Sequence, residues 1–386
     1  MQIHRSISLA VLCWAVLMCS TLSLAGQHYV VTNDDAGGAN TATLYTVSGS
    51  PTLPVLTQKK VIPTGGKGLG GGYFAATGIT FVNDGQEQCI FVADSGSSDV
   101  AGIVANTQQV SGRFKGSRGD SGGLNGVTLA ANNKYLYASF TGTFTIAAFQ
   151  VQSGCMLKFL KDVDAVGLGF GSAGPMAVHG NLLLVAFGDG TIESFNIANG
   201  VPVPNGDLQL STGSKSGELP SGVEITQDGH YALFGDISEN ATVEVSDISS
   251  GKLTTTVPYS LGVGDADTIS LSPDESMLYI ANNKQGTVTA AFFDKATGVI
   301  GTGCTSNVLS GFNSNWVYLG NLKTSTNSGL GGALYVAEDG LVSGVGVVQL
   351  TSNGTTCTLS EASDSPFSDP NSQSLRALAP YPPRTF

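Results

Sequence analysis

Residues 271–282, Leu-Ser-Pro-Asp-Glu-Ser-Met-Leu-Tyr-Ile-Ala-Asn, join the end of one apolar strand to a polar turn and a second apolar strand. The same phrase occurs seven times, and its second strand usually ends on a small or acidic residue. The second strands lie at 29–33, 90–94, 136–140, 184–188, 232–236, 279–282 and 335–338. Short strands that recur at a fixed period are typical of a β-propeller. We therefore predict an all-β, seven-bladed β-propeller of four-stranded antiparallel blades.

The predicted first strands set the period of the repeat. They begin 46 to 49 residues apart, near Ile79, Val127, Met176, Val223, Ile269 and Val317. The phrase at 29–33 has no first strand before it, whereas 375–379 is an apolar strand left over near the other end. We expect this segment to become the innermost strand of the N-terminal blade and so to close the ring. The polar stretch 360–372 is expected to be a surface loop.

The composition suits strands joined by tight turns. Charged residues make up only 12% of the 386 residues, where about 25% is typical of soluble proteins. The 52 glycines supply the positive φ that tight turns need. The formal net charge is −12. Because a chain of this charge repels the phosphate backbone, nucleic acid is not expected as a partner.

The first 25 residues have the pattern of an export signal. Arg5 precedes an apolar run over 7–24, and Ser23-Leu24-Ala25 places small residues at the −3 and −1 positions of a cleavage site. An uncleaved anchor and a lipid attached at Cys19 are the competing interpretations. No later stretch reaches the ~18 apolar residues that a membrane span needs. We predict a mature chain, 26–386, that forms one propeller domain, is monomeric, has no membrane span, and is periplasmic or extracellular.

Four cysteines remain after the predicted cleavage, and four in an exported protein indicate two disulfides with three possible pairings. Three of them, Cys155, Cys304 and Cys357, each follow a turn that is expected to begin a fourth strand. Cys89 begins a second strand, so all four should lie at one face of the ring. We expect neighbours to pair, as Cys89–Cys155 and Cys304–Cys357.

The strand Tyr29-Val30-Val31-Thr32-Asn33 and the stretch 271–283 resemble the repeat of the YVTN and lactonase-type seven-bladed propellers, and the blade pattern covers about 28–382. This repeat is shared by enzymes, binding modules and cell-surface proteins. Its lactonase-type enzymes, phosphogluconolactonase-like and muconate-cyclase-like, carry a Pro-Arg-His run on an inner strand and a Glu after the following strand. Here the matching run is Pro220-Ser221-Gly222, and the matching acid is Asp236, which the resemblance makes the candidate catalytic residue.

A candidate binding site lies where the second strands end. Because neighbouring strands of a blade alternate in direction, these ends and the starts of the first strands meet at one mouth of the central channel. Five of the seven ends are polar: Asn33, Asp94, Asp236, Asn282 and Glu338. Converging carboxylates and amides can bind a small polar ligand or Ca²⁺, and close carboxylates can supply an acid/base pair. The alternative is that these residues only terminate strands and form local turns.

Three functions follow from these observations. The first is a binding or interaction propeller outside the cytoplasm, with a small polar ligand, a cation or a protein partner at the channel mouth and no required cofactor. The second is a lactone hydrolase in which Asp94, Asp236 or Glu338 activates water. The third is a structural surface protein without a small-molecule site. Trp316 either faces the channel or packs between blades, and glycine-rich connections at 65–72, 115–126, 167–175 and 262–267 are expected to overhang the mouth.

Overall fold

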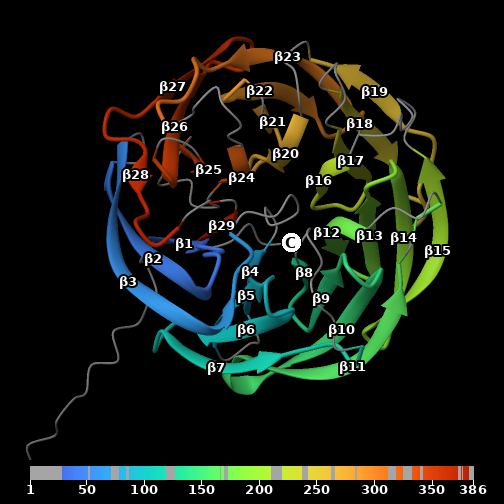
Figure 1. Ribbon diagram of the computed structural model, residues 1–386. Coiled ribbons are helices and arrows are strands. Elements are labelled where there is room, and N and C mark those ends of the chain that lie inside the picture. Colours follow the sequence, from blue (N-terminus) through green and yellow to red (C-terminus); the bar gives the residue numbers. More distant parts are fainter. Residues whose placement is uncertain are drawn as a thin grey trace, which may run out of the picture.

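Seven antiparallel sheets stand around a common axis as the blades of a propeller (Figure 1). The predicted seven-bladed fold is therefore confirmed. The computed structural model describes residues 28–50, 53–70, 78–83, 87–118, 127–165, 167–168, 173–209, 220–236, 242–261, 266–282, 285–311, 319–324, 333–339, 342–372, 375 and 377–381. The predicted leader and Trp316 lie outside these residues.

The first four blades contain the following strands, given from the innermost to the outermost. Blade 1 contains β29 (Ala377–Tyr381), β1 (His28–Asn33), β2 (Ala39–Ser50) and β3 (Leu53–Lys67). Blade 2 contains β4 (Ile79–Asn83), β5 (Gln88–Asp94), β6 (Asp99–Val104) and β7 (Gln109–Phe114). Blade 3 contains β8 (Val127–Ala131), β9 (Tyr135–Phe140), β10 (Thr145–Gln152) and β11 (Met156–Asp164). Blade 4 contains β12 (Ala173–His179), β13 (Leu182–Phe187), β14 (Thr191–Ala198) and β15 (Val201–Gln209).

The remaining three blades follow in chain order. Blade 5 contains β16 (Pro220–Ile225), β17 (Tyr231–Asp236), β18 (Thr242–Asp247) and β19 (Val257–Ser260). Blade 6 contains β20 (Ala266–Leu271), β21 (Met277–Asn282), β22 (Thr287–Asp294) and β23 (Val299–Thr305). Blade 7 contains β24 (Leu319–Thr324), β25 (Ala333–Glu338), β26 (Gly344–Ser352) and β27 (Cys357–Glu361), with β28 (Phe367–Ser368) paired to β26. A short 3₁₀ turn, η2 (Ser153–Cys155), precedes β11.

The turn between β20 and β21 shows why the repeated phrase folds as a hairpin. Ser272 Oγ donates to Asp274 Oδ1 at 2.6 Å, and the N–H of Ser276 donates to the same oxygen at 3.1 Å. Glu275 takes up the left-handed conformation, with φ of 60°. The N–H of Ser272 then donates to the carbonyl of Met277 at 2.8 Å, which starts the ladder. The Ser-Pro-Asp-Glu-Ser sequence is therefore closed by its own side chains.

The ring closes through β29, as predicted. This strand pairs antiparallel with β1, and Val31 lies opposite Ala379. The closing strand occupies 377–381 rather than the expected 375–379. Leu375 comes just before it, fully buried, and donates its N–H to Ser343 Oγ at 3.1 Å. The pairing covers an edge of β1 that would otherwise be open.

Three innermost strands begin earlier than predicted. β12, β16 and β20 start three residues before the predicted first residues Met176, Val223 and Ile269. Each has a register shift close to its start, such as the shift between Ala266 and Ile269 in β20. The regular apolar pattern begins only beyond this irregularity, so the sequence pattern marks the start of the regular ladder rather than the start of the strand.

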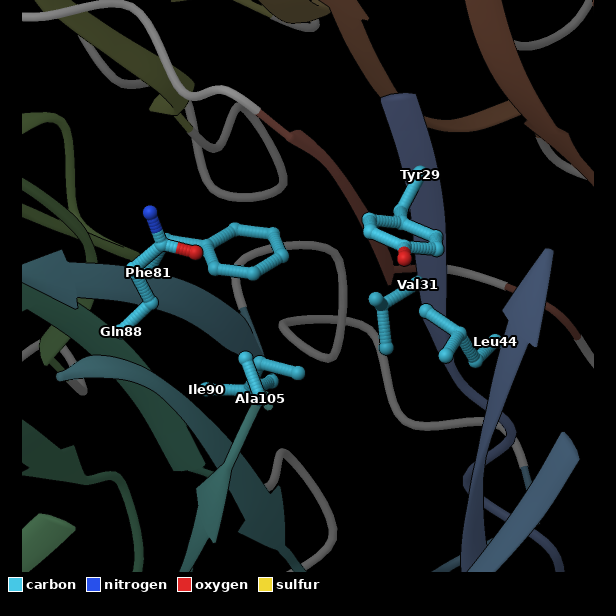
Figure 2. Close-up of a pocket in the computed structure, with 7 residues that line it drawn as sticks. All are labelled: Tyr29, Val31, Leu44, Phe81, Gln88, Ile90 and Ala105. Atoms are coloured by element: carbon cyan, nitrogen blue, oxygen red, sulfur yellow. The ribbon is translucent and has the colours of Figure 1, made fainter. Parts of the chain in front are cut away.

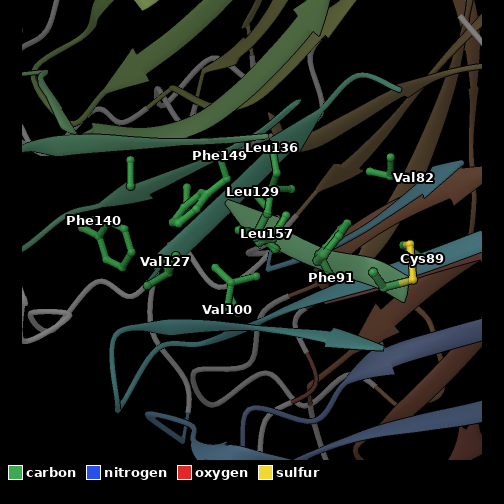
Figure 3. Close-up of a cluster of buried hydrophobic side chains, with 14 residues drawn as sticks. Val82, Cys89, Phe91, Val100, Val127, Leu129, Leu136, Phe140, Phe149 and Leu157 are labelled. Atoms are coloured by element: carbon green, nitrogen blue, oxygen red, sulfur yellow. A yellow bond between two sulfur atoms is a disulfide. The ribbon is translucent and has the colours of Figure 1, made fainter. Parts of the chain in front are cut away.

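The core is distributed over the boundaries between neighbouring blades. Between blades 2 and 3, the buried side chains of Phe91, Leu136 and Phe149 belong to one cluster (Figure 3). Six further buried clusters are formed by the described residues elsewhere in the ring. Full burial of a large apolar side chain contributes roughly 1.5–3 kcal/mol to stability. Each boundary therefore has its own share of the stabilising contacts.

Both predicted disulfides are confirmed. Cys89–Cys155 joins blade 2 to blade 3, with Cα atoms 5.3 Å apart, and Cys304–Cys357 joins blade 6 to blade 7 at 5.6 Å. The expected position of Cys304 was wrong, because this residue is next to last in β23 rather than at its start. The turn at Lys295–Gly298 begins the strand already at Val299. Cys304 therefore reaches Cys357 from the far end of its strand.

The stretch 360–372 was expected to be a surface loop, and this expectation was wrong. It contains β28, where Phe367 lies opposite Val345 of β26. Asp369 is only 1% exposed, and its N–H donates to the carbonyl of Ser343 at 2.8 Å. The segment folds back onto blade 7 because its backbone groups are satisfied there. It reaches the boundary between blades 7 and 1.

Candidate functional site

The five predicted site residues end the second strands of their blades, at the face that we call the upper face. All five side chains are buried, with exposed fractions between 0% and 3%: Asn33, Asp94, Asp236, Asn282 and Glu338. The contacts resolved by the structure connect two of them, Asn33 and Asp94, through Asn40. The other three lie in different blades. Direct contact of these five residues with a ligand stays a prediction.

The boundary between blades 1 and 2 is built from a chain of polar side chains. Asn33 Nδ2 donates to the carbonyl of Ala93 at 2.9 Å. Asn40 Nδ2 donates to Asn33 Oδ1 at 2.9 Å and to Asp94 Oδ1 at 2.8 Å. Thr64 Oγ1 donates to the same Asp94 oxygen at 2.6 Å. These bonds fix the end of β5 against three strands of the neighbouring blade.

Asp94 is closed off from solvent by a glycine. A Cβ added at Gly66 would lie 2.1 Å from Asp94 Oδ2, so the backbone at Gly66 covers this oxygen. Among the described residues, no hydrogen-bond donor reaches Oδ2. Burial raises the pKa of Asp94 to about 7, against the hydrogen bonds from Thr64 and Asn40, which lower it. Asp99, the next acid, is neutralised by Arg113 and lies 3.9 Å from Lys115 Nζ.

Glu338 in blade 7 has the same kind of environment. The N–H of Gly311 donates to Oε2 at 3.0 Å, and a Cβ at Gly346 would lie 1.9 Å from Oε1. Burial, and next the charge of Glu361, raises the pKa of Glu338 to about 8. Glycines thus let the backbone cover a carboxyl closely at two separate blades.

Asn282 and Asp236 are held within their own blades. Asn282 Nδ2 donates to Thr287 Oγ1 at 3.0 Å and to Thr289 Oγ1 at 2.9 Å, both on the adjacent strand β22. Asp236, the candidate catalytic residue, lies opposite Pro220 on one side and Thr242 on the other. The structure therefore places Asp236 beside the Pro220-Ser221-Gly222 run, as the resemblance implies.

The run at 220–222 leaves little space between blades 5 and 6. A Cβ at Gly222 would lie 2.9 Å from both the backbone N and Cγ1 of Ile269 in blade 6. A Cβ at Gly235 would lie 3.0 Å from the carbonyl oxygen of Ala266. Blades 5 and 6 approach each other across these two glycines, and the position matched to the family histidine has no room for a side chain.

Asp34 and Asp369 were not predicted as site residues, yet they form a buried acid pair at the upper face, where both contact Thr32. Asp34 Oδ2 accepts hydrogen bonds from Thr41 Oγ1 at 2.5 Å and Thr43 Oγ1 at 2.7 Å. Burial, and next the charge of Asp369, raises the pKa of Asp34 to about 8. No sequence signal could have paired residues that lie in blades 1 and 7.

A narrow apolar crevice separates blades 1 and 2 nearer the lower face (Figure 2). Tyr29 and Gln88, which line it, lie at or next to the lower ends of β1 and β5. Its empty space is about 250 Å³, a figure that includes open solvent. The other lining residues are Val31, Leu44, Phe81, Ile90 and Ala105.

Burial raises the pKa of Asp34, Asp94 and Glu338 towards neutral pH, as it does for many general acids and bases. At Asp94 and Glu338, however, close backbone contacts enclose the carboxyl, so its main physical effect is to hold the upper-face turns. The described residues include no group of three or more His, Cys, Asp or Glu side chains arranged to hold a metal ion. They also include no helix long and apolar enough to span a membrane.

Fold and site together define a seven-bladed propeller whose polar upper-face residues are buried at blade boundaries. No family model and no curated protein matches the chain. Among solved structures, it is similar to a candidate 6-phosphogluconolactonase from Bacteroides fragilis NCTC 9343, with a TM-score of 0.69 and 14% identity over 93% of this chain and 99% of that one.

Two further structures are similar. One is a functionally unknown protein from Desulfotomaculum acetoxidans DSM 771, with a TM-score of 0.61 and 12% identity over 92% of this chain and 98% of that one. The other is the periplasmic gluconolactonase of Pseudomonas aeruginosa, with a TM-score of 0.53 and 16% identity over 68% of this chain and 76% of that one. Likeness at these identities shows the fold alone.

Proposed function

We propose that the chain is an exported propeller that acts as a binding or interaction module, taking a small polar ligand, a cation or a protein partner at the upper mouth of its channel. Export is supported by the two disulfides, which form and persist in oxidising compartments. In this function the buried acids and amides at the second-strand ends hold the upper-face turns in place for binding.

The close contact at Gly222 is the observation that favours binding over lactone hydrolysis. Lactonase-type enzymes have a histidine at the matching position. Here Ile269 of the next blade lies within 2.9 Å of where a Cβ would be. Because the obstacle includes backbone atoms, no rotamer change makes room for a catalytic side chain. The site therefore lacks a charged partner that the family uses beside its acid.

Lactone hydrolysis is the second candidate. It is favoured by the likeness to the gluconolactonase fold and by Asp236, which lies opposite Pro220 as the resemblance implies. In this function Asp236 would activate a water molecule at the upper end of blade 5. The two candidates differ in one observable, which is release of acid from a lactone.

Thermal unfolding of the mature protein with sugars, polyols, divalent cations and aldonolactones tests both candidates. A ligand that binds the folded state raises Tm increasingly as its concentration exceeds Kd. The variants Asp94→Asn and Glu338→Gln test whether a stabilising ligand binds at the upper mouth, because both residues end second strands at that face.

We expect a Tm increase that is lost in Asp94→Asn or Glu338→Gln, without acid release. A Tm increase that both variants retain contradicts binding at the mouth. Lactone-dependent acid release that is lost in Asp236→Asn, but kept in the lower-face variant Asp294→Asn, establishes the hydrolase instead. No Tm shift with any compound leaves the structural surface protein as the remaining function.

A further inference from the structure

Two buried carboxyls meet where the ring closes. Asp34 follows β1 of blade 1, and Asp369 follows β28, which is paired to blade 7. Their exposed fractions are 0% and 1%. The pair therefore lies across the boundary between blades 1 and 7.

A threonine hydroxyl bridges the two acids. Thr32 Oγ1 lies 2.6 Å from Asp34 Oδ1 and 3.1 Å from Asp369 Oδ2, and its longest contact is to the carbonyl of Thr43 at 3.3 Å. A hydroxyl donates one hydrogen and accepts others. If Thr32 donates to Asp369, the short contact to Asp34 is a hydrogen bond only when Asp34 carries a proton and donates it. The geometry therefore fits a relay from Asp34 through Thr32 to Asp369.

The proton is assigned to Asp34 because burial, and next the charge of Asp369, raises the pKa of Asp34, against the hydrogen bonds from Thr32, Thr41 and Thr43, which lower it. The N–H of Asn371 donates to Asp369 Oδ1 at 3.1 Å. Besides the two acids themselves, Tyr45 is the titratable group that acts on the pair among the described residues. The hydroxyl of Tyr45 donates to the carbonyl of Ser368 at 3.5 Å. Burial, and next the charge of Asp369, raises the pKa of Tyr45, so its phenol stays neutral. Among the residues that the structure describes, the groups that act on Asp34 include no cation.

We propose that one proton, held by Asp34 and shared with Asp369 through Thr32, locks the closure of the ring, and that its loss at mildly alkaline pH loosens the boundary between blades 7 and 1. Losing the proton places two carboxylates beside each other in a buried site where the described residues supply no cation. It also removes the donor at the start of the relay. The contacts across the same boundary, Ser372 Oγ to the carbonyl of Asp34 at 3.0 Å and Asn371 Nδ2 to Thr43 Oγ1 at 3.5 Å, are lost with it.

The sign of the effect follows from the raised pKa of Asp34. Its value rises from 3.8 to about 8 in the folded protein. The folded state therefore binds this proton more tightly than the unfolded state, so the contribution of Asp34 to stability is complete below about pH 4 and is lost as the pH rises to about 8. The ring is held most firmly in acid, which makes the closure a pH-sensitive device.

Hydrogen exchange of the mature protein, read by peptide and corrected for intrinsic exchange rates, tests the proposal. We expect the equilibrium constant for opening of β1 and β29 to increase by up to about tenfold per pH unit between about pH 5 and 8. Peptides of β10 in blade 3 should change little. Asp34→Asn, which keeps a neutral donor at the same place, should remove most of this pH dependence.

Glu193→Gln is the matched control, because burial raises the pKa of Glu193 to about 7 but the residue lies in blade 4, away from the closure. This variant should leave the pH dependence of β1 and β29 unchanged. Thr32→Val breaks the relay and should open these strands at every pH. The proposal is overturned if β1 and β29 of the wild-type protein are equally protected at both ends of the pH range. It is also overturned if the opening of Asp34→Asn or Asp369→Asn depends on pH as strongly as that of the wild type.

Discussion

The two boundaries of blade 1, with blades 2 and 7, are stabilised differently from the next boundary on each side, between blades 2 and 3 and between blades 6 and 7. Disulfides join blade 2 to blade 3 and blade 6 to blade 7. Blade 1 lies between these two covalent pairs and, among the described residues, has no disulfide of its own. Beside its apolar clusters, its contacts with blades 2 and 7 include buried polar groups, with Asp94 on one side and Asp34 with Asp369 on the other.

This difference separates two kinds of stability in one ring. A disulfide stabilises the fold by restricting the unfolded chain, and its effect depends on redox conditions. A buried carboxyl stabilises its boundary only in the protonation state that its partners can satisfy, and its effect depends on pH. Blade 1 therefore makes the closure of the ring sensitive to protons while its flanks are sensitive to reductants.

The largest effect is expected from the covalent boundaries. Replacing both members of either disulfide by alanine should reduce the free energy of unfolding by about 4 kcal/mol in the chain-entropy account, since the pairs are 66 and 53 residues apart. Denaturant midpoints with and without reductant measure this effect. Reduction should lower the denaturant midpoint of the wild type. It should not change the midpoint of a variant in which all four disulfide cysteines are alanine. An unchanged wild-type midpoint after verified reduction contradicts the expectation.

A methyl group at Gly66 tests the closely packed polar boundary of blade 1. The new Cβ would lie 2.1 Å from Asp94 Oδ2, so Gly66→Ala should reduce the free energy of unfolding by roughly 1–3 kcal/mol through overpacking. Gly38→Ala is the control, because no heavy atom lies within 4 Å of a Cβ at that position. The comparison fails if urea unfolding shows equal losses in the two variants.

The pH dependence of stability should be partly removed by Glu338→Gln. Burial raises the pKa of Glu338 from 4.5 to about 8, so its contribution is present below about pH 4 and is lost through about pH 8. The fall in unfolding free energy between about pH 5 and 8 should shrink by roughly 1–2 kcal/mol in the variant. A hydrogen bond from Thr297 lowers the pKa of Asp294, which titrates below this range. Asp294→Asn should therefore retain the wild-type fall.

The smallest effect is expected at the outer edge of blade 1. Lys59 Nζ lies 5.1 Å from the centre of the Tyr29 ring, and an exposed cation–π contact contributes about 0.5–1 kcal/mol. Lys59→Met keeps most of the aliphatic stem and should lose about that amount. Lys134→Met, in an exposed turn of blade 3, should stay within about 0.5 kcal/mol of the wild type. Thermal unfolding distinguishes the two variants, and a larger loss in Lys134→Met reverses the assignment.

The architecture was predictable because its signals are local and repeated. Each apolar phrase marks one second strand, and the unmatched segment at 375–379 had one blade left to complete. The disulfide pairing followed because neighbouring blades bring neighbouring cysteines together. The position of Cys304 within β23 was not predictable, since it depends on a turn only a few residues upstream that could begin the strand at several points.

The candidate site was predictable in position but not in environment. Asn33 and Asp94 end their strands as expected, and the structure joins them through Asn40, a residue without any distinctive pattern around it. Nothing in the sequence marked Gly66 as the cover of Asp94. Asp369 was hidden in a stretch that has the composition of a surface loop.

By itself, the sequence determined the fold class, the number of blades, the closing segment and the cysteine pairs, because strand periodicity and repeat length are written in neighbouring residues. The tertiary structure alone decided which carboxyls are buried, which glycines cover them, and that Thr32 meets Asp369 across a separation of 337 residues. Such contacts depend on how two blades approach each other and on side-chain directions at their boundary. Burial at that boundary, rather than the identity of the acid, gives these groups their proton affinity.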